Sequence, residues 1–539
     1  MKRRTAIKSL AGAMASVYFS KALGKGFPNA PTFFKPSWES LAQYQVPDWF
    51  QDAKFGIWAH WGPQCQPERG DWYARGMYQE GTDQYKFHIE KYGHPSKFGF
   101  KDVIHEWKAE NWNPEELVAL YKKAGAKYFV ALANHHDNFD LFNSKHQSWN
   151  STKLGPKKDL IAGWAKAAKN NQLPFGVSVH ASHAWSWLEV AQRSDKNGPY
   201  AGIPYDGKIT TADGKGQWWN GYDPQELYAQ NHALSENSFD NGSIHKQWNW
   251  GNGVAVPSKE YCEKFYNRVI DLIEQYDPEL VYFDDTALPL WPVNDAGLRI
   301  AAHLYNSSIK KHGKLRAVLN GKILDEQQRK CMVWDIERGQ SNQIEPFPWQ
   351  TDTCIGGWHY DRRIYNDNKY KTAKSIIHTL ADIVSKNGNL LLNIPVRGDG
   401  TIDDKERAVV EGIADWMKIN SEAIYATRPW KVYGEGPAMQ SAEPLKAQGF
   451  NEGKGKPFGP EDIRFTTKGK TLYAIVLGMP VEKTILIKSI TEGNIGKVTL
   501  LGHGEPIVSQ QTAQGLKLNL PDQLSGSNAF VLKIEGAIA

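Results

Sequence analysis

Short apolar runs alternate with longer amphipathic stretches between about residue 45 and residue 425 of the chain. The apolar runs, which have the length of buried strands, are residues 55–61, 128–136, 175–181, 280–285, 316–320, 331–337 and 389–395. The amphipathic stretches, which have the spacing of helices, are residues 114–125, 158–171, 259–276 and 370–388. Near-continuous hydrophobic strands that alternate with helices are typical of a parallel sheet covered by helices. At least seven strands in about 380 residues favour a closed (β/α)8-type barrel over an open doubly wound sheet, and no G-x-G-x-x-G follows the first strand.

The pattern changes after about residue 430, where short alternating segments are separated by turns rich in Gly, Asn and Lys. This texture is typical of a β-sandwich. We therefore predict an α/β fold in which a (β/α)8-type barrel (residues 25–430) is followed by a C-terminal β-sandwich domain (residues 431–539). The stretch 198–225 is predicted to be a loop insertion near the barrel mouth.

The first 24 residues, MKRRTAIKSLAGAMASVYFSKALG, have a basic start, a twin arginine and a mildly apolar middle. These features are typical of a twin-arginine-like export signal, and a basic amphipathic helix is the alternative. No other segment approaches 18 uninterrupted apolar residues, so no membrane span is predicted. The expected location is the bacterial periplasm or the medium into which a protein is secreted.

Aromatic residues are the informative part of the composition. The chain has 21 Trp and 23 Tyr, and flat aromatic faces suit the apolar C–H faces of sugar rings, although many of these rings fill a large core. A net charge of +5 is small for 539 residues and does not argue for nucleic acid as a partner. Four widely spaced cysteines form no CxxC pair, which excludes a disulfide scaffold and a structural zinc site of that kind. We predict no cofactor.

Polar residues end several of the predicted strands, and working residues of such barrels lie at those ends. They are His60, His135, His136, His180, Asp284, Asp335 and Glu337. In the run LVYFDD, alternation places Val281 and Phe283 toward the helices, and turns Tyr282 and Asp284 toward the barrel mouth. Asp284 is therefore the catalytic candidate, with a structural carboxylate as the alternative. Asp285 is expected in a turn or helix-capping role.

The histidine pair His135–His136 invites a metal interpretation. Adjacent residues on a strand face opposite sides, so the two are not expected to share an ion, and no H-E-x-x-H motif occurs. We expect one imidazole to bond substrate hydroxyls while its neighbour braces the loop. The alternatives are satisfied core histidines and a metal-dependent hydrolase that a chelator inactivates. The run HASHAW adds His180 and His183 near the same mouth.

A second carboxylate comes from CMVWDIERG, in which Asp335 and Glu337 share one face of a strand. Two carboxylates from two barrel strands, in a cleft rich in Trp and His, are suited to breaking glycosidic bonds. One attacks the anomeric carbon, and the other, kept protonated by its surroundings, donates a proton to the departing oxygen.

With these residues in hand, the chain resembles the α-L-fucosidases of glycoside hydrolase family 29. The likeness lies in WFQDAKFGIWAHWGPQCQPERGDWY (49–73), YFVALANHHDNFDLFNSKHQSWNS (128–151), DPELVYFDD (277–285), GGWHY (356–360), VSKNGNLLLNIPVRGDGTI (384–402) and DWMKINSEAIYATRPW (415–430). The blocks together span the barrel. The resemblance implies a barrel with a C-terminal β-sandwich and a retaining mechanism with an aspartate nucleophile and a separate acid/base.

The resemblance implies that Asp284 is the nucleophile. The acid/base is assigned by position to Glu337, with Asp335 in reserve. The remaining sugar contacts are expected to be His60, Trp72, His135, His136, His180, Tyr282 and Trp358. Four positions depart from the family pattern and bear on the sugar and its subsites rather than on the reaction. They are Asn134 in place of Lys, Asn138 in place of Gly, Ser178 where many members have Tyr, and Asp285 in place of the frequent Gly.

The sequence therefore predicts an exo-acting retaining α-L-fucosidase that needs no metal. Its partner is a carbohydrate, a fucosylated or L-galactosylated glycan. The alternatives are an α-L-galactosidase acting on algal, possibly sulfated, galactans and a sugar-binding barrel without activity. The sequence leaves the oligomeric state open.

Overall fold

The computed structural model describes residues 33–538 apart from 230–231, 237, 240–249, 251–252, 441–449, 523 and 525–527. The predicted export signal, residues 1–24, lies outside the described residues, so the signal and the periplasmic or secreted location stay predictions. None of the helices formed by the described residues has both the length and the apolar character that a membrane crossing requires.

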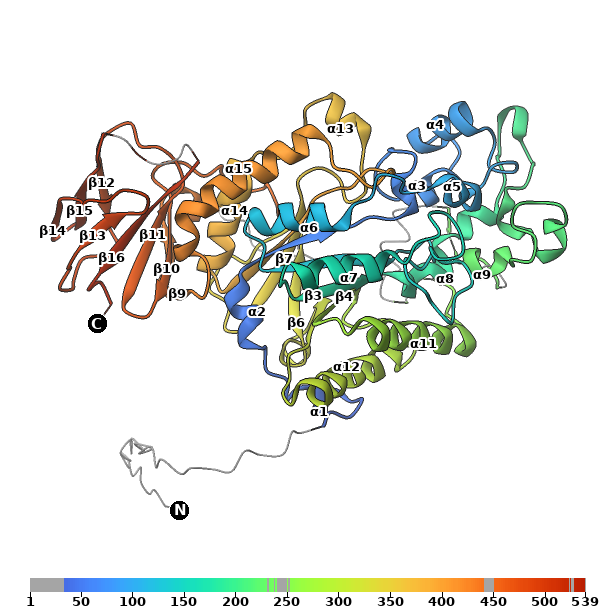
Figure 1. The fold of residues 1–539 in the computed structure, drawn as a ribbon, viewed down its shortest axis with the longest axis horizontal. Helices are drawn as coiled ribbons and strands as arrows, with labels where there is room; N and C mark the ends of the chain where they lie inside the picture. Colours follow the sequence, from blue (N-terminus) through green and yellow to red (C-terminus); the bar gives the residue numbers. More distant parts are fainter. Residues whose placement is uncertain are drawn as a thin grey trace, which may run out of the picture. The chain divides into compact units, whose positions relative to one another are not determined.

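Eight parallel strands close into a barrel in the order in which they occur along the chain (Figure 1). They are β1 (Phe55–Ala59), β2 (Tyr128–Asn134), β3 (Phe175–Val179), β4 (Leu280–Thr286), β5 (Val318–Lys322), β6 (Val333–Glu337), β7 (Trp349–Cys354) and β8 (Gly388–Asn393). β8 closes the barrel by pairing in parallel with β1. The predicted (β/α)8-type barrel is confirmed.

Amphipathic helices follow the strands and surround the barrel (Figure 1). The main ones are α6 (Pro114–Lys123), α7 (Leu160–Asn170), α11 (Lys259–Tyr276), α12 (Ala296–His312), α14 (Ala373–Ser385) and α15 (Asp404–Asn420). All of these except α12 begin at a residue whose side chain accepts a backbone N–H of the first turn. The five capping residues are Asn113, Asp159, Ser258, Thr372 and Asp403. Such caps satisfy donors that a helix start otherwise leaves unpaired.

Strand β7, with the sequence WQTDTC, has no counterpart among the predicted strands because its middle is polar. Those polar side chains are bonded inside the barrel. The Tyr128 hydroxyl donates to Gln350 Oε1 at 2.9 Å, and Gln350 Nε2 donates to Asp335 Oδ1 at 2.8 Å. The Tyr282 hydroxyl donates to Asp352 Oδ2 at 2.6 Å. A strand whose inward residues form a polar network carries no hydrophobic signal, which is why the pattern along the chain missed it.

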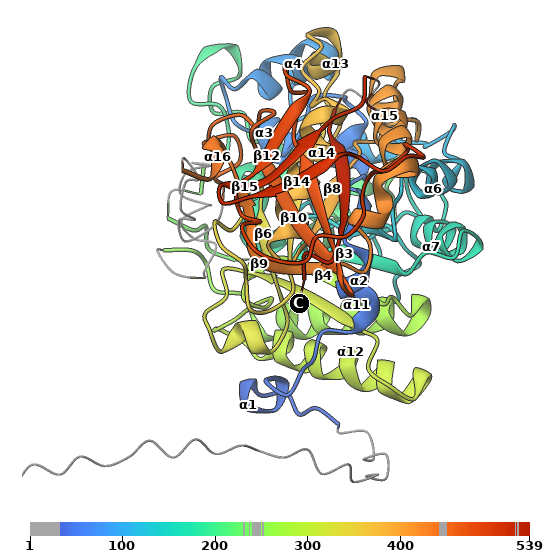
Figure 2. The ribbon, with the colours of Figure 1, turned by 90° about the vertical axis from the view of Figure 1, so that its left-hand side faces the viewer.

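The C-terminal region forms two antiparallel sheets, which Figure 2 shows toward the viewer. One contains β9 (Arg428–Glu435), β10 (Ile463–Lys468), β11 (Thr471–Val476), β13 (Val498–Leu500) and β16 (Phe530–Glu535), and the other β12 (Thr484–Ile487), β14 (Ser509–Thr512) and β15 (Gly515–Asn519). Apolar side chains of both sheets share one buried cluster. The predicted β-sheet domain after the barrel is confirmed, with one short helix, α16 (Pro437–Gln440), between β9 and β10.

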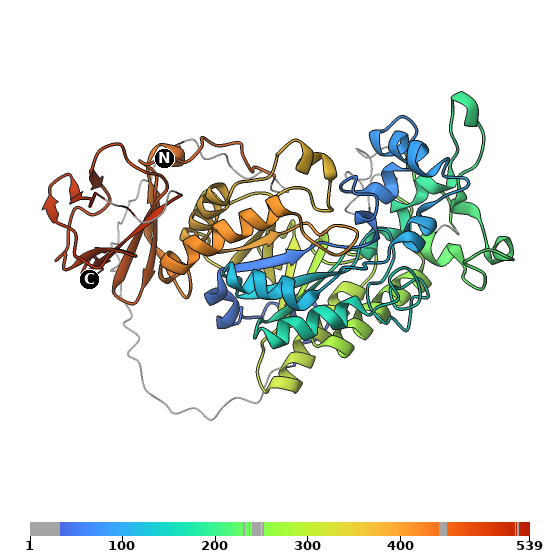
Figure 3. The same cartoon turned by 45° about the horizontal axis from the view of Figure 1, so that its top comes forward.

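Short helices and turns gather at the end of the barrel that lies away from the C-terminal sheets (Figures 1 and 3). They include α3 (Tyr73–Gly76), α4 (Asp83–Tyr92), α5 (Phe100–Glu106), α8 (Ala184–Trp187) and α9 (Pro224–Tyr228). The predicted insertion at 198–225 belongs to this group, since Tyr78 donates to its Asp206 at 2.7 Å. These segments surround the mouth of the barrel, where the carboxyl ends of the strands lie.

Candidate active site

A cleft of about 370 Å³ opens at the carboxyl ends of the barrel strands. Eight of its lining residues were predicted from the sequence: His60, Trp72, His135, His180, Tyr282, Asp284, Glu337 and Trp358. Eight others were not: Trp58, Asp71, Lys322, Ile323, Arg338, Asp352, Gly357 and Phe450. A volume near 300–1,000 Å³ is typical of small-ligand sites.

Strand β4 delivers Asp284 to this cleft as alternation predicts. Tyr282 and Asp284 line the cleft, whereas Val281 and Phe283 are fully buried. The expectation for Asp285 was wrong, because β4 continues through Thr286 and Asp285 is a strand residue. It faces away from the cleft and accepts hydrogen bonds from Ser182 Oγ and from His183 Nε2, the latter at 2.8 Å. Asp285 therefore anchors the segment after β3.

Three donors converge on the Asp284 carboxylate. Lys322 Nζ lies 2.6 Å from Oδ1, and His136 Nε2 and His180 Nδ1 each lie 3.1 Å from Oδ2. Burial works to raise the pKa of Asp284, but the Lys322 charge and the two imidazole hydrogen bonds outweigh it and hold the pKa well below its usual value. Asp284 is thus an ionised carboxylate at neutral pH, with its side chain 18% exposed toward the cleft.

Glu337, the last residue of β6, has the opposite electrostatic setting. Burial, with the negative charges of Asp284 and Asp352, raises the pKa of Glu337 to about 7 against the opposing effect of Lys322. Lys322 Nζ also lies 2.5 Å from Glu337 Oε2. Because one nitrogen bonds both carboxylates, at 2.6 and 2.5 Å, the two bonded oxygens are at most about 5 Å apart.

Lys322 is the central site residue that the sequence analysis missed. It ends β5, two residues beyond Asn320, where the apolar run had already stopped. Asn320 and Lys322 share the inward face, so extending the alternation of β5 by two residues would have found it. Its two carboxylate partners hold the pKa of Lys322 well above the ordinary value in spite of burial. The ammonium charge therefore persists between the two acids.

Asp335, the reserve acid/base, lies deeper in the barrel than Glu337. It is 1% exposed, is bonded to Gln350 and is not among the cleft-lining residues. Burial and the neighbouring Asp352 raise the pKa of Asp335 well above its usual value. A neutral carboxylic acid in this position takes part in the hydrogen-bond network beneath the cleft, where it accepts from Gln350.

Several buried polar atoms around the cleft have no hydrogen-bond partner among the described residues. They are both ring nitrogens of His60, Nε2 of His180, Nε2 of His359 and Nε1 of Trp58. Unpaired buried polar groups are costly unless a ligand satisfies them. Burial lowers the pKa of His60 well below its usual value and that of His180 to about 4. Neutral imidazoles offer one donor and one acceptor each, which suits hydroxyl groups.

The expectation that His135 and His136 face opposite sides of a strand does not apply. β2 ends at Asn134, so His135 and His136 follow the strand and need not face opposite sides. Ligand atoms of His135, His136 and His180 lie within 4.8 Å of one another, and so do those of His60, Asp71, His135 and His359. The expectation that the pair cannot share an ion was therefore wrong. Either group could hold a metal ion by geometry.

His135 and His136 have different surroundings, and their predicted roles stay predictions. His135 lines the cleft, and Gln64 Nε2 lies 2.9 Å from its Nδ1. His136 places Nδ1 2.7 Å from the His180 carbonyl oxygen and Nε2 against Asp284. Both ring nitrogens of His136 therefore face acceptor oxygens, one of them on Asp284.

Aromatic rings form the walls of the cleft. Trp358 packs near Trp58 and His60, with ring centroids 5.5 and 5.8 Å apart. Trp72, on another side, lies edge-on to His136 at 6.2 Å and has a left-handed backbone with φ of 60°. Flat rings in such positions suit the apolar faces of a sugar.

Two of the departures from the family pattern, Asn138 and Asn134, have local physical reasons. Asn138 stands at φ of 66°, where asparagine is the best substitute for glycine, and its side chain donates to the carbonyls of Glu226 and Leu227. Asn134 donates to Asp140 at 2.9 Å and accepts from the His180 backbone N–H at 3.2 Å. Ser178 is fully buried in β3 and does not line the cleft.

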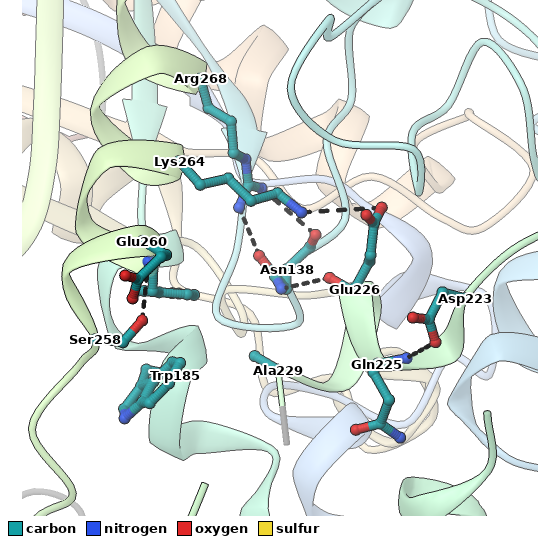
Figure 4. A pocket seen from close by; sticks show the side chains of 11 residues that line it. Asn138, Trp185, Asp223, Gln225, Glu226, Ala229, Ser258, Glu260, Lys264 and Arg268 are labelled. Carbon is teal, nitrogen blue, oxygen red and sulfur yellow. Dashed lines mark hydrogen bonds and ion pairs between the residues drawn. The ribbon is translucent and has the colours of Figure 1, made fainter. Parts of the chain in front are cut away.

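A second cavity, of about 240 Å³, lies between α9 and α11 (Figure 4). Its two cationic groups already have partners. Arg268 Nη1 donates to Asn138 Oδ1 at 2.6 Å, and Lys264 Nζ lies 3.9 Å from Glu226 Oε2. The cleft at the strand ends, with its unpaired donors and acceptors, is therefore the candidate active site.

Two carboxylates of unlike pKa, set close together at the mouth of a barrel, are the parts with which a glycosidic bond is broken. The class of protein that this arrangement defines is a glycoside hydrolase. The chain belongs to the α-L-fucosidase family: the family model described as alpha-L-fucosidase matches residues 23–422, and the alpha-L-fucosidase C-terminal domain matches residues 457–535.

Individual relatives agree with this assignment. Tissue alpha-L-fucosidase of Rattus norvegicus is 26% identical over 94% of this chain and 93% of its own length. Plasma alpha-L-fucosidase of Homo sapiens is 25% identical over 92% of this chain and 90% of its own. Among solved structures, the Thermotoga maritima alpha-L-fucosynthase is 25% identical, covers 93% of this chain and 99% of its own, and superimposes with a TM-score of 0.68.

Proposed function

We propose that the protein is an exo-acting retaining α-L-fucosidase with Asp284 as nucleophile and Glu337 as acid/base. The observation that carries this proposal is the carboxylate pair, whose bonded oxygens are at most about 5 Å apart, since retaining enzymes separate their carboxyl groups by about 5–5.5 Å. The solved relative from Thermotoga maritima described as an alpha-fucosidase in complex with a mechanism based inhibitor, 25% identical, supports covalent chemistry in this fold.

In the first step Asp284 Oδ attacks C1 of the fucosyl group, and the bond from C1 to the leaving oxygen breaks. Glu337 gives its proton to that oxygen, so the leaving group departs as an alcohol. In the second step the ionised Glu337 takes a proton from water, whose oxygen attacks C1 and releases Asp284. Two inversions at C1 retain the α configuration, and both carboxyl groups return to their starting protonation states.

The shape of the cleft supports attack at a chain end. Tyr282 and Asp352 close the floor and bond each other at 2.6 Å, and Trp58 is 1% exposed beside them. A sugar at this depth has hydroxyl partners in the unpaired ring nitrogens of His60 and His180. A sugar bound there can carry a continuing chain only on its anomeric oxygen.

The first test is an assay of the purified protein on aryl α-L-fucoside and aryl α-L-galactoside in parallel, with the product anomer followed by NMR. Release of the phenol from the fucoside with α-L-fucose as the first product supports the proposal. First formation of the β anomer, or no phenol release from either substrate, would contradict it. Faster release from the galactoside would favour the L-galactosidase alternative.

The pKa of Glu337 determines the pH above which kcat/KM falls. Glu337 is active as the protonated acid, so kcat/KM is expected to fall as pH rises through about 7. Asp284 must be ionised, and its lowered pKa keeps activity down to pH values below the ordinary carboxylate range. Lys322 lowers the pKa of both acids, so Lys322→Gln is expected to move both limbs upward by about one pH unit.

The pH–rate profile of kcat/KM checks this expectation. Lys369→Gln, at an exposed lysine paired with Asp367, is the matched control and should leave the profile unchanged. If the acidic and alkaline sides of the profile have the same midpoints in Lys322→Gln as in the wild type, Lys322 does not shift the pKa values of Asp284 and Glu337.

Removal of metal ions is expected to leave activity unchanged, because the carboxylate pair needs none. Dialysis against a chelator, with metal content measured before and after, checks this. Added Zn²⁺ is expected to inhibit, since it competes for the imidazoles of His135, His136 and His180. Loss of activity on chelation and its return with one metal ion would instead support the metal-dependent hydrolase.

A further inference from the structure

One rim of the cleft is built from three bulky residues with left-handed backbones. Ile323 follows β5 with φ of 54°, Arg338 follows β6 with φ of 44°, and Phe450 has φ of 55°. All three line the cleft that holds Asp284 and Glu337. Left-handed conformations are uncommon for large side chains and outliers for a β-branched one, and such strain gathers at functional sites.

Phe450 reaches the cleft from the connection between β9 and β10, two strands of the C-terminal five-stranded sheet. Its backbone N–H donates to the carbonyl oxygen of Glu337 at 3.0 Å. The next two residues are fastened to the barrel, because Asn451 exchanges two bonds with the backbone of Gln340 and Glu452 N–H donates to the Arg338 carbonyl. The position of Phe450 is therefore set by the strand that carries the proposed acid.

The side chains of this rim remain open. Phe450 is 45% exposed, although its neighbour Asn451 is buried. The Arg338 side chain is 43% exposed, with Nε 3.1 Å from Glu452. Glu452 is also held by Lys371 and by Thr353 Oγ1. In the part of the chain that the structure describes, no acceptor engages the two terminal nitrogens of Arg338.

The order of the strands separates this rim from the sugar-binding side. The unpaired imidazoles of His60 and His180 follow β1 and β3, whereas Ile323 and Arg338 follow β5 and β6 on the far side of the closed barrel. Glu337 ends β6 and directly precedes Arg338, so the proposed acid lies next to this rim. An acid that protonates the leaving oxygen has the fucosyl ring on one side and the leaving group on the other.

We propose that Phe450, with Arg338 and Ile323, forms the surface of this enzyme that binds the sugar ring of the leaving group. The ring stacks its apolar C–H face on Phe450, and the terminal nitrogens of Arg338 donate to its oxygen atoms. A small alcohol does not reach this rim. The proposal rests on the proposed fucosidase activity and names the residues that select the leaving group at that same site.

The test compares two substrates in the intact enzyme. α-L-Fucosyl fluoride has a leaving group of one atom that cannot touch Phe450, and a fucosyl disaccharide has a leaving group that can. Phe450→Asn is expected to lower kcat/KM on the disaccharide about tenfold, or about 1.4 kcal/mol, and to leave the fluoride within about twofold. Asparagine tolerates the left-handed backbone and keeps the N–H that bonds Glu337, so only the ring is lost.

Phe450→Tyr should keep the disaccharide rate, and Phe347→Asn, at a phenylalanine of matching 47% exposure outside the cleft, should change neither substrate. Equal rates for the wild type and Phe450→Asn on both substrates, or equal losses on both, would overturn the subsite. A wild-type enzyme inert on fucosyl fluoride would instead overturn the fucosidase activity. Calorimetry on catalytically silent Asp284→Asn adds a second readout: a disaccharide should bind about tenfold more tightly than fucose only when Phe450 is present.

Discussion

Asp284→Gly is expected to lower kcat for fucoside hydrolysis by about 10⁴-fold or more, which corresponds to about 5 kcal/mol of transition-state stabilisation. The loss is expected because the carboxylate that attacks C1 is gone. Sugar binding should persist, because the imidazoles of His60 and His180 keep their free nitrogens. Steady-state kinetics on aryl α-L-fucoside and calorimetry with fucose measure the two effects.

Azide restores a nucleophile to the glycine variant in a way that reveals the mechanism. The small anion enters the space left by the carboxylate, next to Lys322, and attacks C1 once, so the expected product is the inverted β-L-fucosyl azide. Asp285→Asn is the matched control, because Asp285 faces away from the cleft toward His183. That variant should lose thermal stability while retaining most of its turnover. Near-wild-type turnover in Asp284→Gly would contradict the assignment.

Glu337→Ala is expected to show a loss that grows with the basicity of the leaving group. A disaccharide, whose leaving oxygen must be protonated, should lose about 10²–10⁴-fold in kcat/KM, since general acids contribute about that much. A 2,4-dinitrophenyl fucoside leaves without protonation and should lose far less in the first step. The fall in kcat/KM as pH rises through about 7 should disappear with the carboxyl group.

Azide distinguishes the two carboxylates by stereochemistry. In Glu337→Ala the covalent intermediate on Asp284 still forms, and azide attacks it from the opposite face, which gives the α-L-fucosyl azide with retained configuration. The acid/base would instead be Asp335 if two results were found. Asp335→Asn would form the α-L-fucosyl azide, and Glu337→Ala would hydrolyse the disaccharide at the wild-type rate. We expect Asp335→Asn to act chiefly on stability, because Asp335 is bonded to Gln350 beneath the cleft.

Some of the site follows from patterns confined to one strand. The alternation of LVYFDD turns Asp284 toward the cleft, because side chains of a strand change face at every residue. The same rule misjudged His135 and His136, which lie beyond the end of β2. The alternation rule also missed Lys322, because the polar residues at the end of β5 do not extend the apolar run that predicted the strand.

The fold class and the carboxylate that faces the barrel mouth follow from the sequence alone. These depend on local periodicities of hydrophobic and polar residues, which short segments express without knowledge of the rest of the chain. The tertiary structure decided that β7 completes the barrel through buried polar bonds, that Lys322 joins Asp284 to Glu337, and that Phe450 arrives beside the acid. These contacts join residues far apart in the chain, so only closure of the barrel and the return of the later segment fix their distances.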